Sequence, residues 1–146
     1  MDGTTLTQFF AGDHREADAS WAAVEQAVET GDREAAAGAF ETYKKRMLRH
    51  FAMEEEVLFP AFEEETGMRS GPTEVMRREH EQMKGLLAQM EDLCAKGDLE
   101  ELLNLGDTQL MLVQQHNQKE ETILYPMAEG SLAGAWSELL GRLESY

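Results

Sequence analysis

The chain has 146 residues, with 29 acidic against 13 basic side chains and a formal net charge of −16. Such a charge repels phosphate backbones and anionic lipid, so it argues against binding to nucleic acid or to a membrane surface. No apolar run reaches the ~20 residues of a membrane span, and the first residues lack the pattern of a signal peptide. A single cysteine excludes an internal disulfide framework. These features predict one soluble cytoplasmic domain over residues 1–146.

Apolar spacings of three, four and seven residues predict an all-helical chain. The four long helices are expected over about residues 5–30, 33–59, 72–96 and 99–125. Pro60 lacks the N–H of a continued helical ladder, so the second helix is expected to kink or end there. Short connections favour antiparallel neighbours, which gives an all-α, up-down-up-down antiparallel four-helix bundle.

A short C-terminal helix is expected over about residues 131–145. Ser131 follows Gly130 and is predicted to cap this helix. One face is apolar, with Leu132, Trp136, Leu139, Leu140 and Leu143. We expect that face to pack on the bundle, and a homodimer contact through it is the alternative.

The chain contains an internal repeat with an offset of 66 residues. The segment His50-Phe-Ala-Met-Glu54-Glu55-Glu-Val-Leu-Phe-Pro60 returns as His116-Asn-Gln-Lys-Glu120-Glu121-Thr-Ile-Leu-Tyr-Pro126. The same offset carries His14 onto His80, so all four histidines obey it. The bundle is therefore expected to consist of two αα halves, at about residues 6–66 and 72–130.

The repeated histidines and glutamates are predicted to converge. In each copy a His and a Glu lie four residues apart and share one helix face. Antiparallel packing then brings six side chains to one end of the bundle at one depth: His14, His50, Glu54, His80, His116 and Glu120. A lone histidine on an apolar stripe would indicate core packing. Burying all six without a metal would leave polar groups unsatisfied at roughly 1–3 kcal/mol each, so together they predict a two-metal site.

The donor types narrow the choice of metal. Nitrogen and oxygen donors without a nearby thiolate suit Fe, Mn or Zn rather than Cu(I) or an iron–sulfur cluster. Each half offers one metal two imidazoles. If Glu54 and Glu120 both bridge and an oxo or hydroxo group adds a fifth ligand, a six-coordinate metal keeps one open position. This arrangement favours iron or manganese and predicts that a small ligand binds there.

These residues resemble the hemerythrin-like, HHE cation-binding family, whose members are four-helix bundles with a non-haem di-iron centre. The resemblance covers about residues 6–126 and rests on the doubled His-x-x-x-Glu-Glu-x-[Val/Ile]-Leu-[Phe/Tyr]-Pro motif. It implies two Fe ions joined by an oxo or hydroxo bridge, with Mn and Zn ranked behind iron. The implied ligands are His14 and His50 on one iron, His80 and His116 on the other, and Glu54 and Glu120 as bridges.

The sequence departs from the oxygen-carrying hemerythrins, which use five histidines and an Asp five residues after the last one. Met76 and Lys84 stand four residues to either side of His80, and Glu121 stands where that Asp would be. Both metals are therefore expected to be open, which argues against simple reversible oxygen carriage. The arrangement is closer to the family's iron–sulfur repair and nitric-oxide-responsive members, although their usual N-terminal cysteine-containing segment is not in this sequence.

The leading functional interpretation is a di-iron protein that binds oxygen, nitric oxide or peroxide for sensing, storage or detoxification, with a redox partner. The alternatives are an oxidase-, peroxidase- or iron–sulfur-repair-type enzyme, and a metal-independent helical interaction module. Glu55, Glu56 and Glu121 are assigned mainly to a solvated face, with Glu55 and Glu121 as candidate acceptors for imidazole N–H groups. Because Ala17 is smaller than its counterpart Met83, more room is expected beside His14 and His50.

Overall fold

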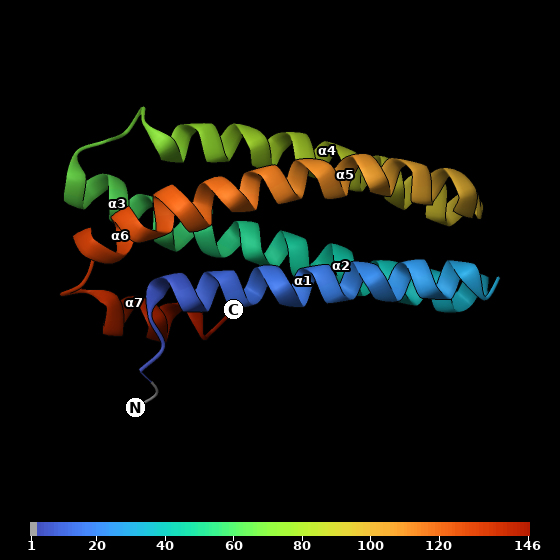
Figure 1. The fold of residues 1–146 in the computed structure, drawn as a ribbon, viewed down its shortest axis with the longest axis horizontal. Helices are drawn as coiled ribbons and strands as arrows, with labels where there is room; N and C mark the ends of the chain where they lie inside the picture. The colour runs from blue at the N-terminus through green and yellow to red at the C-terminus, as the bar shows by residue number, and fades with distance from the viewer. Residues whose placement is uncertain (1–2) are drawn as a thin grey trace.

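The computed structural model describes residues 3–146, and its regular elements are all helical (Figure 1). The four long helices are α1 (Leu6–Glu29), α2 (Arg33–Met53), α4 (Pro72–Lys96) and α5 (Leu99–Lys119). Neighbours run antiparallel: α1 packs on α2 and α4 packs on α5, while α2 also contacts α4 and α1 contacts α5. The predicted all-α antiparallel bundle is therefore confirmed. Within residues 3–146 none of the helices is long and apolar enough to cross a membrane.

The same two residue types, Gly followed by Asp, form the tight turn between α1 and α2 and the tight turn between α4 and α5. Gly31 and Gly97 adopt φ values of 74° and 75°, a conformation that a residue with a Cβ adopts only with strain. Asp32 and Asp98 follow them, and each side chain accepts a hydrogen bond from the backbone N–H three residues on, which caps the next helix. These turns hold α1 against α2 and α4 against α5.

A π-helical segment follows each of the long helices that end in a His-x-x-x-Glu motif. The segments are η1 (Glu54–Leu58) and η2 (Glu120–Leu124), followed by α3 (Phe59–Thr66) and α6 (Tyr125–Ser131). The N–H groups of Phe59 and Tyr125 donate to the carbonyls five residues back. Because a proline ring clashes with the carbonyl four residues before it, the wider turn makes room for Pro60 and Pro126. The helix therefore does not end at Pro60, as one of the two expectations held; it widens before the proline and continues to Thr66.

The C-terminal helix α7 (Trp136–Leu143) begins later than predicted. Ser131 is the last residue of α6, and α7 starts after Ala135, so the predicted cap at Ser131 is wrong. The reason is that α6 continues through Gly130 once the π turn has accommodated the proline. Leu139 and Leu143 are buried in the core, so the apolar face packs on the bundle as expected. A homodimer contact through this helix stays a prediction.

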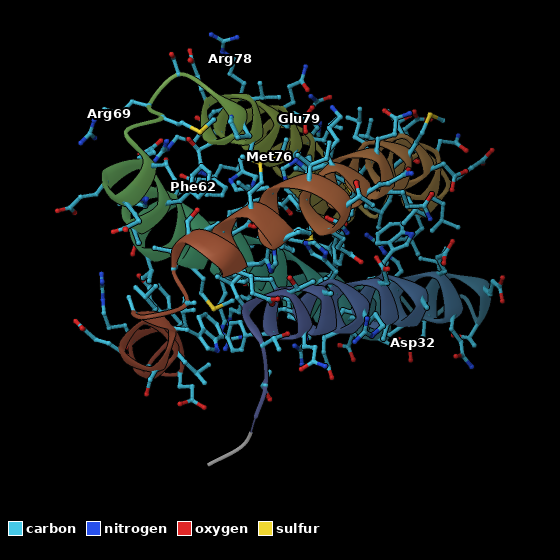
Figure 2. All side chains as sticks on the ribbon, turned by 60° about the vertical axis from the view of Figure 1, so that its left-hand side comes forward. Asp32, Phe62, Arg69, Met76, Arg78 and Glu79 are labelled. Atoms are coloured by element: carbon cyan, nitrogen blue, oxygen red, sulfur yellow. The ribbon has the colours of Figure 1, made fainter. Side chains whose placement is uncertain are left out.

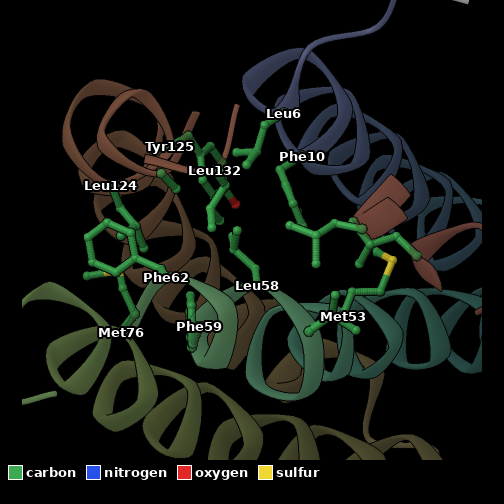
Figure 3. Packing of buried hydrophobic residues seen from close by; sticks show 14 residues of the cluster. Leu6, Phe10, Met53, Leu58, Phe59, Phe62, Met76, Leu124, Tyr125 and Leu132 are labelled. Atoms are coloured by element: carbon green, nitrogen blue, oxygen red, sulfur yellow. The ribbon is translucent and has the colours of Figure 1, made fainter. Parts of the chain in front are cut away.

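Two apolar clusters fill the bundle, one on each side of the predicted histidine layer. Figure 3 shows the first, which includes Phe10, Phe59 and Tyr125. The second includes Ala17 and its neighbours from the other long helices. Since His14 lies between Phe10 and Ala17 on α1, apolar side chains cover the polar layer from both directions along the bundle. In Figure 2 the labelled Phe62 and Met76 point inward, whereas Arg69 and Arg78 point outward.

Candidate metal centre

All six predicted site residues lie together in the interior. Each is at most 5% exposed: His14, His50, Glu54, His80, His116 and Glu120. One ligand atom from each of Glu54, His80, His116 and Glu120 lies within 4.8 Å of the others, and the same holds for His14, His50 and Glu120. The two groups share Glu120, so the structure joins them into one cluster suited to a metal site.

The imidazoles lie in two pairs that follow the halves of the repeat. The ring centroids of His14 and His50 are 4.6 Å apart, and those of His80 and His116 are 4.9 Å apart. We call these the first and the second histidine pair. Each pair takes one residue from each of two neighbouring helices, α1 and α2 or α4 and α5, as the predicted assignment of ligands requires.

Both buried glutamates lie between the two histidine pairs. Glu54 Oε1 is 3.4 Å from His50 Nε2 and 3.0 Å from His80 Nε2. Glu120 Oε1 is 3.1 Å from His14 Nε2, and Glu120 Oε2 is 3.3 Å from His116 Nε2. Each carboxylate therefore contacts one imidazole of each pair. Glu121 does not occupy this position, because its side chain is 38% exposed and reaches the far side of the His14 ring.

These spacings fit metal coordination. Adjacent donors around an ion with bonds of roughly 2.0–2.2 Å lie about 3 Å apart in an octahedron and about 3.5 Å apart in a tetrahedron, and the contacts above fall in that range. His116 Nε2 and Glu120 Oε2 are buried and have no hydrogen-bond partner among the described residues. Leaving such groups unsatisfied costs roughly 1–3 kcal/mol each. A cation between them removes that cost.

A carboxylate faces the outer nitrogen of every imidazole. The Nδ1–H groups of His14 and His50 donate to Glu121 and Asp13, each at 2.7 Å. Those of His80 and His116 donate to Glu55 and Glu79, at 2.7 and 2.8 Å. Because an ionised carboxylate only accepts hydrogen bonds, each neutral imidazole carries its proton on Nδ1 and directs the Nε2 lone pair into the cluster. The four rings are thus oriented as metal ligands.

The sequence predicts only two of the four carboxylates that accept from the imidazole Nδ1 groups. It indicates Glu55 and Glu121 as candidate acceptors, on a face assigned mainly to solvent, and it does not indicate Asp13 and Glu79. The repeat contains the signal that could have found them, because an acidic residue directly precedes both His14 and His80. Figure 2 shows Glu79, the acceptor for His116, on α4.

The charged residues that contact the four Nδ1 acceptors differ between the two halves of the repeat. Basic side chains form ion pairs with three of these carboxylates: Arg49 with Asp13, Lys84 with Glu55, and Lys119 with Glu79. Across residues 3–146 no lysine or arginine forms an ion pair with the fourth, Glu121. The residue 66 positions before Lys84 is Asp18, whose pKa is raised first by burial and also by the charge of Glu121, against an opposing effect of His14.

The charges of the buried glutamates raise the pKa of neighbouring histidines in the metal-free chain. Burial alone would lower the pKa of His50, but Glu54 and Asp13 outweigh it and raise that pKa to about 10. Burial opposes charge at His116 too, and Glu120 raises its pKa to about 9. Burial would raise the pKa of Glu54, yet His50 holds it well below its usual value. The cluster is thus built to contain positive charge between carboxylates.

Tyr125 is a seventh polar side chain of the cluster, and the sequence did not identify it. Its fully buried hydroxyl donates toward Glu54 Oε2 at 2.6 Å and Glu120 Oε1 at 2.9 Å. The same oxygen is 3.1 Å from His14 Nε2 and 3.4 Å from His50 Nε2. The expectation of extra room beside the first histidine pair rested on Ala17, which belongs to the second apolar cluster, whereas Tyr125 belongs to the first; that expectation stays a prediction.

Two surface hollows lie near the cluster, and α5 borders both of them. One, of about 290 Å³, lies between α1 and α5 and is lined by His14, Asp18 and Glu121 among others. The other, of about 30 Å³, lies between α4 and α5 and is lined by Glu79 and Met83 among others. The first hollow borders one residue of the cluster, His14, whereas the lining of the second contains none of the six.

The comparisons with known proteins agree with this geometry. The family model described as "Hemerythrin HHE cation binding domain" matches residues 5–128, which contain every residue of the cluster. No curated protein and no solved structure gives a significant match to the chain.

Proposed function

Because the chain belongs to the hemerythrin HHE cation-binding domain family, we propose that its buried cluster holds two iron ions. The site then binds a small molecule (oxygen, nitric oxide or a peroxide) in the service of sensing, storage or detoxification. Iron supplies the ligand-binding and redox chemistry, and the chain supplies the donors and their orientation.

One observation carries this proposal: each buried carboxylate contacts one imidazole of each histidine pair. Glu54 lies between His50 and His80, and Glu120 lies between His14 and His116. Such an arrangement supports two neighbouring metal positions that share both carboxylates. Nitrogen and oxygen donors without a thiolate favour iron over softer metals.

The remaining residues support the same function. The Nδ1 acceptors orient the rings and increase the basicity of the ligands, and the two apolar clusters keep bulk water away from the donors. The net charge of −16 disfavours nucleic acid and anionic lipid as partners. We propose a cytoplasmic protein that exchanges electrons with a redox partner. A metal-independent interaction module gives no reason for burying four imidazoles and two carboxylates in one cluster.

Metal analysis and an optical spectrum of aerobically purified protein test the proposal. We expect about two iron atoms per chain, and an oxidised form that absorbs in the near ultraviolet through an oxo bridge. One zinc per chain with a featureless spectrum would contradict the proposal. Steady-state consumption of peroxide with an added reductant would instead assign the same site to a peroxidase-type enzyme.

A further inference from the structure

We propose that the Tyr125 oxygen is itself a metal ligand, bound to the iron of the first histidine pair. The protein then fills a coordination position at that iron, and the small molecule binds at the iron of the second pair. This inference rests on the proposed function, because it requires iron in the cluster.

The position of the Tyr125 oxygen is that of a ligand. It lies 2.6–3.4 Å from four donor atoms, the Nε2 atoms of His14 and His50 and one oxygen each of Glu54 and Glu120. The donor atoms of the six site residues lie at similar distances from one another, 3.0–3.4 Å. Tyr125 therefore extends the group His14, His50 and Glu120 by one more donor atom.

When both imidazoles are neutral, as metal ligands must be, hydrogen bonding alone does not satisfy this group. The Nδ1 protons of His14 and His50 are already donated to carboxylates, so in the neutral rings both Nε2 atoms are acceptors. The carboxylate oxygens of Glu54 and Glu120 are acceptors as well. The single hydroxyl proton of Tyr125 can be donated to only one of these four atoms at a time. A cation placed among them satisfies all four and the phenol oxygen together.

The ring is held in place. It stacks on Phe10 with centroids 5.2 Å apart and on His14 at 5.6 Å, each with an interplanar angle of 28°. The π turn of η2 ends directly before Tyr125 and fixes its backbone. Because the ring is fully buried, the oxygen stays beside the first histidine pair.

Binding requires no oxidant or reductant. The O–H bond of Tyr125 breaks, the proton passes to solvent, and the phenolate oxygen bonds to the iron, whose oxidation state does not change. Proton release on metal binding is the rule for protein ligands. Tyrosinate oxygen is a known iron ligand, as in the haem of catalase.

Among residues 3–146 the second histidine pair has no equivalent oxygen beside it. The residue 66 positions before Tyr125 is Phe59, whose ring stacks on His80 with centroids 5.6 Å apart, and Phe51 stacks on His80 at 4.2 Å. The unpartnered atoms His116 Nε2 and Glu120 Oε2 are on this side. The second pair therefore offers the position for a small ligand.

Spectroscopy of the full chain, loaded with iron and oxidised, tests the inference. A ferric tyrosinate absorbs in the visible range and shows tyrosine ring modes in resonance Raman spectra, which shift when the protein contains ring-deuterated tyrosine. We expect these signals in the wild type and their complete loss in Tyr125→Phe, with iron content still at about two per chain. The matched control is Tyr43→Phe, which removes another buried phenol, from the second apolar cluster, and should leave the signals unchanged.

A second variant keeps the test decisive if Tyr125→Phe loses iron. Phe59→Tyr places a phenol beside the second histidine pair and should add a second tyrosinate signal. Azide should bind one iron of the wild type and should lose that site in Phe59→Tyr. Iron without tyrosinate modes in the wild type, or modes that survive Tyr125→Phe, would overturn this inference and leave the di-iron proposal standing. A chain that takes up no iron would overturn both.

Discussion

The first and second histidine pairs consist of residues 66 positions apart, yet they differ in what lies against them. The Tyr125 hydroxyl contacts His14 and His50, whereas the Phe59 ring stacks on His80. Asp18 lies near Glu121 behind the first pair, whereas Lys84 pairs with Glu55 behind the second. The repeat thus preserves the six site residues and varies their neighbours. Two metal positions with matching imidazoles and carboxylates can in this way acquire different reactivity.

The same pattern extends to the end of the bundle. Glu63 accepts a hydrogen bond from the Thr73 hydroxyl, and Glu129, 66 residues later, accepts one from the backbone N–H of Thr7. Each carboxylate thus ties a helix that follows a π turn to the start of a long helix. Of these two carboxylates, Glu63 alone also forms an ion pair with a cation among the described residues, Arg77. The hydrogen bond from each carboxylate to a threonine is thus repeated in both halves, whereas the ion pair is present at Glu63 and not at Glu129 among the described residues.

The largest expected effect comes from removing an imidazole. His50→Ala should lose iron from the first pair and lower the free energy of unfolding of the iron-loaded protein by about 4 kcal/mol, the stabilisation that a ligand gives at a thousandfold excess over its dissociation constant. Its counterpart, His116→Ala, should do the same at the second pair. Iron content and thermal melting, with and without a chelator, provide the measurement.

Glu55→Ala is the control for these variants. Glu55 accepts from His80 Nδ1 but does not lie inside the cluster, so this variant should keep its iron with affinity lowered about tenfold to a hundredfold. Iron loss equal to that of His50→Ala would mean that the carboxylates are assigned wrongly.

The pH dependence of the affinity for iron tests the first and the second histidine pair in one experiment. The pKa values of His50 and His116 in the metal-free chain are raised to about 10 and about 9, above the ordinary value of roughly 6.5. Their contribution to the stability of the metal-free fold is thus complete below about pH 6.5 and lost as the pH rises through the raised values. Iron must displace these protons, so affinity should rise by up to about tenfold per pH unit for each proton released. An affinity for Fe(II) that stays constant between about pH 6.5 and 8.5 would contradict this.

Glu63 and Glu129 should contribute differently to the free energy of unfolding and to its loss in acid. Arg77 lowers the pKa of Glu63 despite the opposing effect of burial, and the Thr7 N–H lowers that of Glu129. The stabilisation is present above the unfolded pKa of about 4.3 and lost as pH falls through the folded values. At neutral pH, Glu63→Gln should cost about 1 kcal/mol in urea unfolding and Glu129→Gln less than about half of that, because only the first breaks an ion pair. Equal losses would show that Arg77 does not matter.

The smallest expected effect comes from exchanging the charges of Asp18 and Lys84, which lie near the Nδ1 acceptors Glu121 and Glu55. Asp18→Lys places a cation near Glu121, as Lys84 lies near Glu55, and should raise the free energy of unfolding by less than about 1 kcal/mol. Lys84→Asp should lower it by a similar amount. Both shifts should shrink in high salt, because exposed charges are screened. A shift that salt does not change would indicate an altered structure rather than electrostatics.

Periodicity and the repeat were enough to predict the bundle and the convergence of six side chains. The reason is physical: His14 and His80 near helix starts, with His50 and His116 near helix ends, meet at one level in any antiparallel bundle. The Nδ1 acceptors Asp13 and Glu79 were harder to predict. Each lies on a helix that neighbours the one carrying its histidine, and pairings between helices do not follow from the spacing along one helix.

Tyr125 could not be predicted from α-helical spacing. Five residues beyond Glu120, it would lie roughly 140° around an α-helix from that glutamate, facing another direction. In the π turn of η2 the Tyr125 N–H bonds to the Glu120 carbonyl five residues back, and this wider turn brings the Tyr125 side chain nearer to the face of Glu120. The same widening carries the helix past Pro126, so one unexpected turn accounts both for the missed residue and for the helix that continues.

The most direct measurement is a crystal structure of the iron-loaded protein with anomalous diffraction at the iron edge. We expect two peaks, one bonded to His14, His50 and Tyr125 and the other to His80 and His116, with Glu54 and Glu120 reaching both. A single peak, or peaks outside the six buried side chains, would contradict the two-metal site.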